Sequence, residues 1–429
     1  MDFFTRTPAE QIASVMRRVY DHGLTTATGG NISVLDERGD IWITPKAVDK
    51  GSLTEKDIVC VHPDGTYEGI HAPSSEIFFH RATYRARPDF RAVVHAHPVY
   101  CIAFSLTRTL PRIDLLPHTY SLCRNMRLSK YAMMGSPALG DNLYTEFAKG
   151  ADVVFLENHG VCVGGENLLL AYQLFETIEY AAKLDLLSRK TGAPFPLTQA
   201  QMEQYSNRER PDYRPLTQRS RGAAEQALRA DMVQKLRRGC EHALLTGATG
   251  VCSARLDVNS FLITPEGLDL ALLTEDDLVL VCGENAEEGK HPSVETPLHA
   301  AIYAGQQEVQ AVFSAAPVHV MAFAASLREF ATSTVPESYY MLRAVPKCAY
   351  EEAMNQPETA ATRFSAKMPV VLFDHYRIVT TGETLFTAFD RMEVAEATAA
   401  SILTAQDAGT VILLNESEIR DLRETFHLG

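Results

Sequence analysis

Helical periodicity recurs in three long segments of the chain. Residues 9–23 and 167–190 place apolar side chains three or four positions apart, as amphipathic helices do. Residues 73–88 predict a third helix, which begins near a pair of serines and ends before Pro88. We expect each helix to cover a neighbouring layer of structure with its apolar face.

Between these helices lie short runs rich in β-forming residues. Each run is closed by a turn that contains glycine, proline or asparagine. The runs cover residues 40–45, 57–65, 91–98 and 152–160. Strands mixed with amphipathic helices predict an α/β sandwich. The order of the strands in the sheet does not follow from these patterns.

This pattern occurs twice along the chain. Four blocks of the first half recur in the second half in the same order, at shifts of 217 to 220 residues. The matched blocks are 16–33 with 236–253, 42–61 with 262–281, 72–98 with 291–317 and 153–182 with 370–399. A tandem duplication of a unit of roughly 200 residues follows, which is a normal size for one domain. We expect a first domain over 1–191, a polar, proline-rich linker over 192–222 and a second domain over 223–429.

Composition and charge narrow the class of protein. The 429 residues are 46% hydrophobic and 22% charged, as in ordinary globular chains. A net charge of −14 argues against nucleic acid or an anionic membrane surface as a partner. The chain has no apolar run long enough to span a bilayer, no signal-peptide pattern at its N-terminus and no CxxC pair among its eight cysteines. We expect a cytoplasmic protein with reduced thiols.

Three histidines of the first copy form a candidate metal site. His95 and His97 lie one residue apart on a predicted strand, so both imidazoles point to the same face. His159 ends another predicted strand, directly before a glycine that allows a sharp turn. Three histidines that leave a fourth position open are typical of a catalytic metal ion. Taken singly, each is better explained as a core, surface or turn histidine.

Other polar residues near turns have two interpretations each. Glu76 is a general acid/base beside a divalent ion, or a carboxylate that complements the dipole of its helix. Ser74 and Ser75, at the same helix start, either cap the helix or hold an anion. Asn31 follows two glycines and is either a turn residue or a polar group that a substrate approaches.

The segments GGN, ITP, PSSE, HAHP and NHG, in this order and spacing, resemble those of the class II aldolase/adducin family. The resemblance covers nearly all of the first copy, and the second copy is similar as a degenerate relative. It implies two tandem class II aldolase-like α/β/α sandwiches, each with a central, mainly antiparallel sheet covered by helices. It also implies a divalent metal held by the three histidines, Zn²⁺ before Mn²⁺, Mg²⁺ or Fe²⁺, with Glu76 as the acid/base. The anion pocket is expected from Asn31, Thr44, Ser74 and Ser75.

One segment departs from the family pattern. In the sugar-phosphate aldolases the ITP segment typically continues with Ser-Gly, whereas here Lys46 and Ala47 follow. Glycine gives phosphate a close backbone approach that alanine restricts, while lysine supplies a flexible positive charge. Lys46 is therefore either a substrate-binding residue or a solvated loop lysine. A carboxylate or another non-phosphate anion fits this segment at least as well as a sugar phosphate.

The second copy has lost all three candidate metal ligands. Ser314, Ala316 and Tyr376 stand at the positions of the histidines, while Glu295 is retained at the position of the candidate acid/base. A site with no imidazole left cannot hold the ion, so we expect this copy to be catalytically inactive. Its apolar pattern persists, which indicates that it was kept as a structural partner.

The resemblance also bears on assembly. Family sites lie between neighbouring subunits of a four-fold tetramer, so two chains of paired copies would form a homodimer that imitates the tetramer. In these aldolases a tyrosine of the neighbouring subunit can act as a proton donor. Tyr120 and its counterpart Tyr339 are candidates for that catalytic role, and both are also explained as packing tyrosines.

Together these features predict a divalent-metal-dependent C–C lyase. We expect aldol or retro-aldol chemistry on a small hydroxy-carbonyl substrate, phosphorylated or not, through a metal-stabilised enediolate. Decarboxylation of a hydroxy-aromatic or keto acid, oxygenation at non-haem iron, epimerisation and dehydration are alternatives for the same site. An adducin-like scaffold is the non-enzymatic alternative, and the ligands retained in the first copy argue against it.

Overall fold

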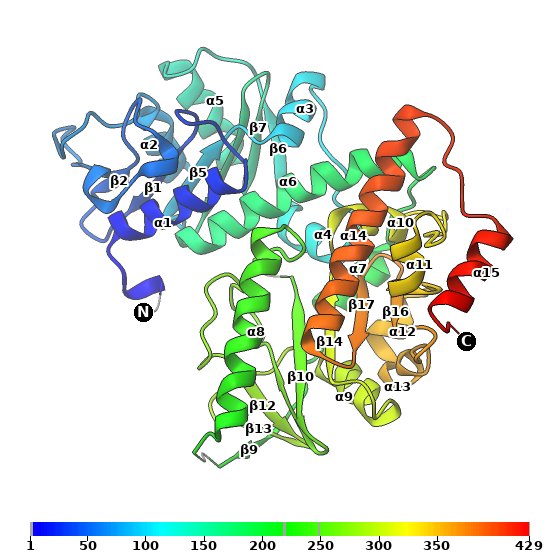
Figure 1. Cartoon of the computed structure of the whole chain (residues 1–429). Helices are drawn as coiled ribbons and strands as arrows, with labels where there is room; N and C mark the ends of the chain where they lie inside the picture. Colours follow the sequence, from blue (N-terminus) through cyan, green and yellow to red (C-terminus); the bar gives the residue numbers. More distant parts are fainter. Residues whose placement is uncertain (1–2, 218–219, 248, 429) are drawn as a thin grey trace. The chain divides into compact units, whose positions relative to one another are not determined.

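The computed structural model describes residues 3–217, 220–247 and 249–428. The chain divides into two units, one made of Met1–Ile113 and Thr119–Lys183, the other of Asp114–His118 and Leu184–Gly429. Each unit contains one sheet with helices packed on it (Figure 1). The predicted tandem α/β sandwiches are therefore confirmed. The expected domain boundaries at 191 and 222 stay predictions.

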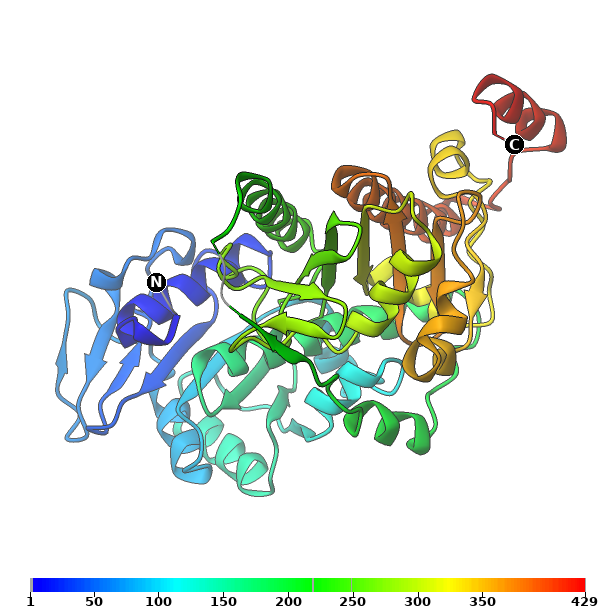
Figure 2. The same ribbon diagram turned by 90° about the horizontal axis from the view of Figure 1, so that it is seen from below.

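The first sheet has the strand order β4-β3-β2-β1-β5-β8-β7-β6. Figure 2 shows the same chain turned by 90°. All neighbours are antiparallel except the edge pair β6 and β7. The strands are β1 (Asn31–Leu35), β2 (Ile41–Ile43), β3 (Val59–Val61), β4 (Tyr67–Glu68), β5 (Ala92–Ala96), β6 (Met126–Ser129), β7 (Val153–Leu156) and β8 (Gly160–Gly165). The helices are α1 (Pro8–Asp21), α2 (Ile77–Ala86), α3 (Val99–Thr107), α4 (Pro117–Cys123), α5 (Pro137–Ala148) and α6 (Leu168–Lys190), with 3₁₀ turns at Phe3–Thr5, Lys50–Ser52 and Glu55–Asp57.

Alternation along the strands divides the first sheet into two faces. Ile41, Ile43, Val59 and Val61 join the buried cluster formed with α2 and α5. The residues between them, such as Trp42, point to the opposite face because successive side chains alternate across a strand. One turn of α1 is fixed by a capping box and by a proline at its start, which confirms the helix predicted over 9–23.

The second sheet repeats the strand order of the first. Its order, β15-β16-β17-β14-β10-β11-β12-β13-β9, matches the first sheet strand for strand and adds β9 beside β13. The strands are β9 (Arg214–Leu216), β10 (Val251–Asp257), β11 (Ser260–Ile263), β12 (Val279–Cys282), β13 (Asn285–Glu287), β14 (Ala311–Ala315), β15 (Lys347–Cys348), β16 (Val370–Phe373) and β17 (Arg377–Gly382). The helices are α7 (Gln199–Ser206), α8 (Ala223–Glu241), α9 (Thr296–Gly305), α10 (Val318–Ala324), α11 (Pro336–Leu342), α12 (Tyr350–Asn355), α13 (Pro357–Ala361), α14 (Leu385–Ala408) and α15 (Glu416–Thr425).

The segment 192–222 is more regular than its composition suggests. It contains α7, which starts at a Thr198 capping box, and β9, which pairs in parallel with β13. Neither element has a strong apolar period, because α7 is short and β9 is an edge strand that tolerates Pro215.

Two further sequence expectations concern cysteines and membranes. All eight cysteines are free, and all but Cys282 are buried. None of the helices in the described part of the chain is both long and apolar enough to cross a bilayer.

Candidate active site

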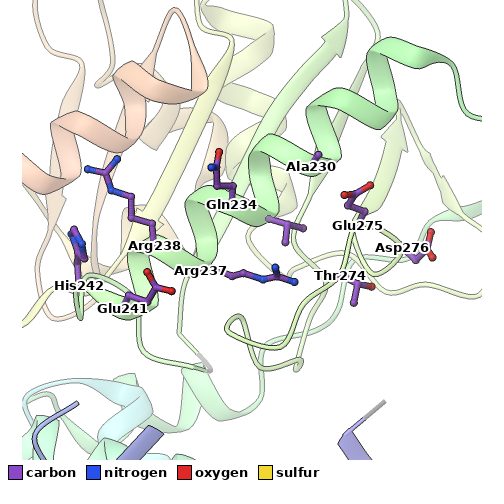
Figure 3. A pocket seen from close by; sticks show the side chains of 10 residues that line it. Ala230, Gln234, Arg237, Arg238, Glu241, His242, Thr274, Glu275 and Asp276 are labelled. Atoms are coloured by element: carbon purple, nitrogen blue, oxygen red, sulfur yellow. The ribbon is translucent and has the colours of Figure 1, made fainter. Parts of the chain in front are cut away.

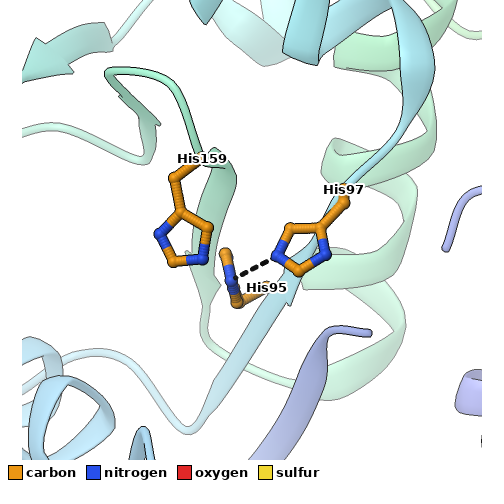
Figure 4. A group of neighbouring side chains, drawn as sticks. All are labelled: His95, His97 and His159. Atoms are coloured by element: carbon orange, nitrogen blue, oxygen red, sulfur yellow. Dashed lines mark hydrogen bonds between the residues drawn. The ribbon is translucent and has the colours of Figure 1, made fainter. Parts of the chain in front are cut away.

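The three candidate ligands of the first copy converge on one point. His95 lies in β5, His97 follows that strand by one residue, and His159 precedes β8 (Figure 4). One ring nitrogen from each lies within 4.8 Å of the others, and the Nε2 atoms of His95 and His97 are 3.2 Å apart. Both were expected on the strand, but β5 ends at Ala96 before the proline that starts α3.

Local backbone geometry allows this close approach. Gly160, next to His159, has no room for a side chain, because a Cβ there would lie 2.6 Å from the Ala96 carbonyl oxygen. Gly30 adopts a φ of 69° and packs against the backbone of His95, where a Cβ would lie 2.7 Å from its carbonyl oxygen. Glycine is required at both positions because β5 lies between β1 and β8, and each glycine packs against its backbone.

The histidines are held in the form that binds metal. His95 Nδ1 lies 2.9 Å from the Val161 carbonyl oxygen, so it carries the hydrogen and leaves Nε2 free as a ligand. Burial, with the neighbouring imidazoles, holds the pKa of His95 well below its usual value. Burial likewise lowers the pKa of His97 to about 4 and lowers that of His159. All three rings are therefore neutral near pH 7, as ligands must be.

Glu76 lies at the start of α2 and faces the histidines. Its Oε2 is 3.5 Å from His95 Nε2, and its Oε1 is 3.7 Å from His159 Nε2. Asn31 Nδ2 donates to Oε2 at 2.7 Å, whereas the buried Oε1 has no hydrogen-bond partner in the described structure. An unpaired buried carboxylate oxygen beside three neutral imidazoles fits a site that receives a cation or a proton.

A buried chain of polar groups supports Asn31 from behind. His80 Nε2 donates to Asn31 Oδ1, and His80 Nδ1 lies 2.7 Å from the Ser33 hydroxyl. Ser33 in turn lies 2.7 Å from the Tyr84 hydroxyl. Burial lowers the pKa of His80 to about 3, so the ring stays neutral. The chain fixes the amide orientation of Asn31 and thereby the position of Glu76.

The sequence patterns did not predict this chain of Ser33, His80 and Tyr84. A signal was available, because the second copy carries the same residue types at Ser253, His299 and Tyr303. Polar residues kept in both copies, within otherwise apolar segments, indicate a shared buried hydrogen-bond network.

The expected anion-pocket residues differ in exposure. The hydroxyl of buried Thr44 accepts from the Ile32 amide at 3.3 Å, and that of buried Ser74 accepts from the Glu76 amide at 3.3 Å. Ser75 and Lys46 are exposed. Ala47 has a φ of 56°, a conformation that normally selects glycine. The role of the expected anion-pocket residues and of Lys46 in substrate binding stays a prediction.

The two candidate tyrosines lie in different surroundings. Tyr120 is half-buried in α4 of the first unit. Tyr339 lies in α11 of the second unit, where its hydroxyl accepts from Arg423 Nε at 2.6 Å. Tyr339 also lines a cavity of about 900 Å³ together with Arg343, Lys347 and Arg423. Their catalytic role stays a prediction.

The matching site of the second copy is closed by side chains. Glu295 Oε1 accepts from the Tyr376 hydroxyl at 2.8 Å and pairs with Arg377 Nε at 2.8 Å. Its Oε2 accepts from Ser314. The guanidinium of Arg377 thus supplies a positive charge beside Glu295, and it also donates to the Thr249 carbonyl oxygen at 2.9 Å. Arg377 stands at the position of Gly160.

Groups of three metal-ligating side chains, within the described part of the chain, occur only in the first unit. A separate hollow of about 750 Å³ in the second unit lies along α8 and the 274–276 loop (Figure 3). It is lined by side chains of both charges, including Arg237, Arg238 and Glu241, and contains none of the predicted site residues.

Comparison with known proteins identifies the family. Residues 10–186 and 230–403 each match the family described as Class II Aldolase and Adducin N-terminal domain. The chain therefore belongs to this family and carries two copies of its domain.

Three relatives show the activities found among similar proteins. The chain is 32% identical to a 5-deoxy-D-ribulose 1-phosphate aldolase of Bacillus thuringiensis, over 45% of this chain and 91% of the relative. It is 33% identical to an L-fuculose phosphate aldolase of Escherichia coli, over 44% of this chain and 87% of the relative. It is 32% identical to a 3-oxo-tetronate 4-phosphate decarboxylase of Haemophilus influenzae, over 41% of this chain and 85% of the relative. The relatives thus include both aldolases and a decarboxylase.

Proposed function

We propose that this protein is a divalent-metal-dependent C–C lyase with one active copy per chain. The observation that carries the proposal is the buried Oε1 of Glu76, which has no hydrogen-bond partner in the described structure and lies beside three neutral histidines. His95, His97 and His159 would hold the ion, which supplies Lewis-acid polarisation of the substrate's oxygen atoms. Zn²⁺ fits three imidazole ligands with an open fourth position.

Glu76 has the geometry of a proton carrier. Asn31 holds its Oε2, so the free Oε1 is the atom that would take a proton from the substrate or return it. In retro-aldol cleavage the C–C bond breaks, the substrate's hydroxyl proton leaves and the other fragment gains a proton at carbon. In the aldol direction Glu76 would take the proton from carbon, and Tyr120 or Tyr339 would donate a proton to the aldehyde oxygen. Retro-aldol cleavage reverses both transfers.

The substrate class follows from the relatives and from one local difference. The three relatives are named for phosphorylated substrates or products, which supports an anionic hydroxy-carbonyl compound. Lys46 and Ala47 in the loop after β2 differ from the Ser-Gly typical of the sugar-phosphate aldolases, and this supports a carboxylate at least as well.

Decarboxylation is the second candidate reaction. A relative named as a decarboxylase, 32% identical over 41% of the chain, favours it. Loss of CO₂ from a keto acid also leaves a carbanion, which must then gain a proton at carbon. The same position of Glu76 serves both reactions.

The test begins with metal content. We would measure metal per chain in untagged protein purified without chelator, in the wild type and in His97→Ala, with the exposed His242→Ala as the matched control. One equivalent of metal lost in His97→Ala and retained in His242→Ala supports the site. No metal in the wild type after reconstitution would contradict the proposal and favour a scaffold.

The reaction is then assayed with paired substrates. Phosphorylated and unphosphorylated hydroxy-ketones report aldol cleavage by aldehyde release, and keto and hydroxy-aromatic acids report decarboxylation by CO₂ release. Activity on either set that is lost in Glu76→Gln supports a lyase. If the protein instead binds iron and consumes oxygen without releasing either cleavage product, the lyase proposal is contradicted and an oxygenase is indicated.

A further inference from the structure

A second cluster of metal-ligating side chains lies in the first unit, away from the three histidines. Asp40 precedes β2, Cys60 lies in β3 and His62 follows β3. One ligand atom from each residue lies within 4.8 Å of the others. The residue types are an oxygen, a sulfur and a nitrogen donor, the set that zinc-like ions prefer.

Strand pairing places these donors on the face of the sheet opposite to Glu76. Ile41 pairs with Val61 and Trp42 pairs with Cys60, so Asp40 and His62 share the face of Cys60. Ile41 and Val61 point the other way, into the core under α2. β1 and β2 run antiparallel, with Leu35 opposite Ile41, so this cluster also lies at the other end of β1 from Asn31. It is therefore a separate site.

The contacts within the cluster join His62 to two carboxylates beside a buried, free thiol. His62 Nδ1 lies 2.9 Å from Asp40 Oδ1, and His62 Nε2 lies 3.4 Å from Oε1 of the exposed Glu68. Cys60 is only 5% exposed, and its thiol is not part of a disulfide. A fourth ligand is thus available from Glu68, which pairs with Cys60 across β3 and β4.

The charges around the cluster are unbalanced. Asp40 and Asp36 are both largely buried, and Asp36 accepts from the Trp42 indole at 3.2 Å. Two cations lie near the cluster: Arg38, whose side chain is 74% exposed and whose Nε is 3.6 Å from Asp40 Oδ2, and Arg81, which donates to the His62 carbonyl oxygen and not to a carboxylate of the cluster. An exposed guanidinium screens buried carboxylates weakly, so a bound divalent ion would be stabilised here.

The second copy builds the same hairpin without these donors. Ser260, Leu280 and Cys282 stand at the three positions, and β11 and β12 pair in the same register. Glu287, which corresponds to Glu68 in that register, accepts from the fully buried Arg229 at 2.8 Å. Hairpin geometry alone therefore does not require the donors of the first copy, and the second copy supplies its own buried cation.

We propose that Asp40, Cys60 and His62, with Glu68 at the rim, form a second, structural binding site for a zinc-like divalent ion in the first unit. Four protein ligands close such a site to substrate, unlike the three histidines, which leave a position open. The bound ion would tie the turn before β2 to the edge strands β3 and β4.

Cobalt substitution separates the two sites, because only this one contains a thiolate. Metal-free full-length protein carrying His97→Ala is titrated with Co²⁺, and the near-ultraviolet thiolate-to-cobalt charge-transfer band is recorded. We expect this band at about one equivalent of Co²⁺ per chain. Adding Cys60→Ser should abolish it, whereas Cys162→Ser, a matched substitution of another buried thiol, should retain it.

Wild-type protein provides a measurement that needs no substitution at the new site. It should bind about two equivalents of Zn²⁺ per chain, and one of them should be lost in His97→Ala. Absence of the thiolate band, or a band that survives Cys60→Ser, would overturn the proposal and leave an Asp40–His62 ion pair beside a buried thiol. The proposal is independent of lyase activity, so the failure of either leaves the other standing.

Discussion

Glu76 and Glu295 occupy equivalent positions at the starts of α2 and α9, yet their surroundings are opposite. Glu76 has one oxygen held by Asn31 and the other free beside three histidines. Glu295 has both oxygens engaged, by Ser314 and by Tyr376 with Arg377. The first arrangement leaves a carboxylate ready for chemistry, and the second uses it to neutralise a buried guanidinium.

This difference shows how a copy can lose a site and keep its fold. A buried carboxylate without a cation is costly. In the second copy Arg377, at the position of Gly160, supplies beside Glu295 the positive charge that a bound metal would supply in the first copy. The strand order is unchanged, so the fold depends on the apolar core and not on the ligands.

The largest effects are expected when the same Glu→Gln substitution is made in each copy separately. Glu76→Gln should lower the reaction rate by roughly 10²–10⁴-fold with little change in stability, because it removes the proton carrier. Glu295→Gln should keep bound metal and activity but lower the free energy of unfolding by about 3 kcal/mol, because Arg377 is left with an uncompensated buried charge. Turnover and denaturant unfolding of both variants check this. Activity lost in Glu295→Gln at full stability would show that the second copy takes part in catalysis.

A buried lysine should give the first copy a pH dependence that the second lacks. Lys50 is 2% exposed, donates to the Pro45 carbonyl oxygen at 2.7 Å, and has its pKa lowered by burial to about 8. Its counterpart, Leu270, is apolar and buried.

The sign of this effect follows from proton uptake. Below pH 8 Lys50 is protonated in both states, whereas between about pH 8 and 10.5 it is protonated mainly in the unfolded chain. Stability should therefore rise with pH across this window, by up to roughly 3 kcal/mol. Lys50→Leu should remove that rise, measured as the difference in unfolding free energy between wild type and variant at each pH. Parallel curves would contradict a lowered pKa.

Exchanging one residue between the copies tests the buried polar chain. Asn31→Val copies the second unit, leaves His80 Nε2 without an acceptor and frees Glu76 Oε2. We expect roughly a 10- to 100-fold loss of activity and a destabilisation of about 1–2 kcal/mol.

The reverse exchange serves as the control. His299 Nε2 is buried without a partner in the described structure, so Val251→Asn should stabilise the second unit by about 1 kcal/mol. A loss of stability there would show that Val251 is held by packing that the amide disturbs.

The smallest effect concerns two matched turn residues. Ala47 and Gly267 both have positive φ angles, 56° and 76°. Gly267→Ala should destabilise by about 1 kcal/mol, and Ala47→Gly should stabilise by a similar or smaller amount. Thermal unfolding of both variants checks the pair. If Ala47→Gly also lowers substrate affinity, the alanine has a role in the binding loop.

Local patterns in the sequence predicted the repeat, much of the secondary structure and the candidate metal ligands. The repeat, the helices around residues 9–23 and 167–190 and the short strands follow from periodicities that act over a few residues. The metal ligands were also visible, because a histidine pair on a strand and a histidine before a glycine leave a local signature. The loss of all three in the second copy was equally plain from the alignment of the repeats.

Tertiary structure decided what depends on contacts between distant segments. Ser33, His80 and Tyr84 form one chain only because β1 packs on α2, and Arg377 meets Glu295 across 82 positions of sequence. The assignment of Asp114–His118 to the second unit, and the meeting of Asp40 with His62, have the same origin. Periodicity reports which face of an element is buried, whereas the choice of partner depends on strand order and register, which no local pattern contains.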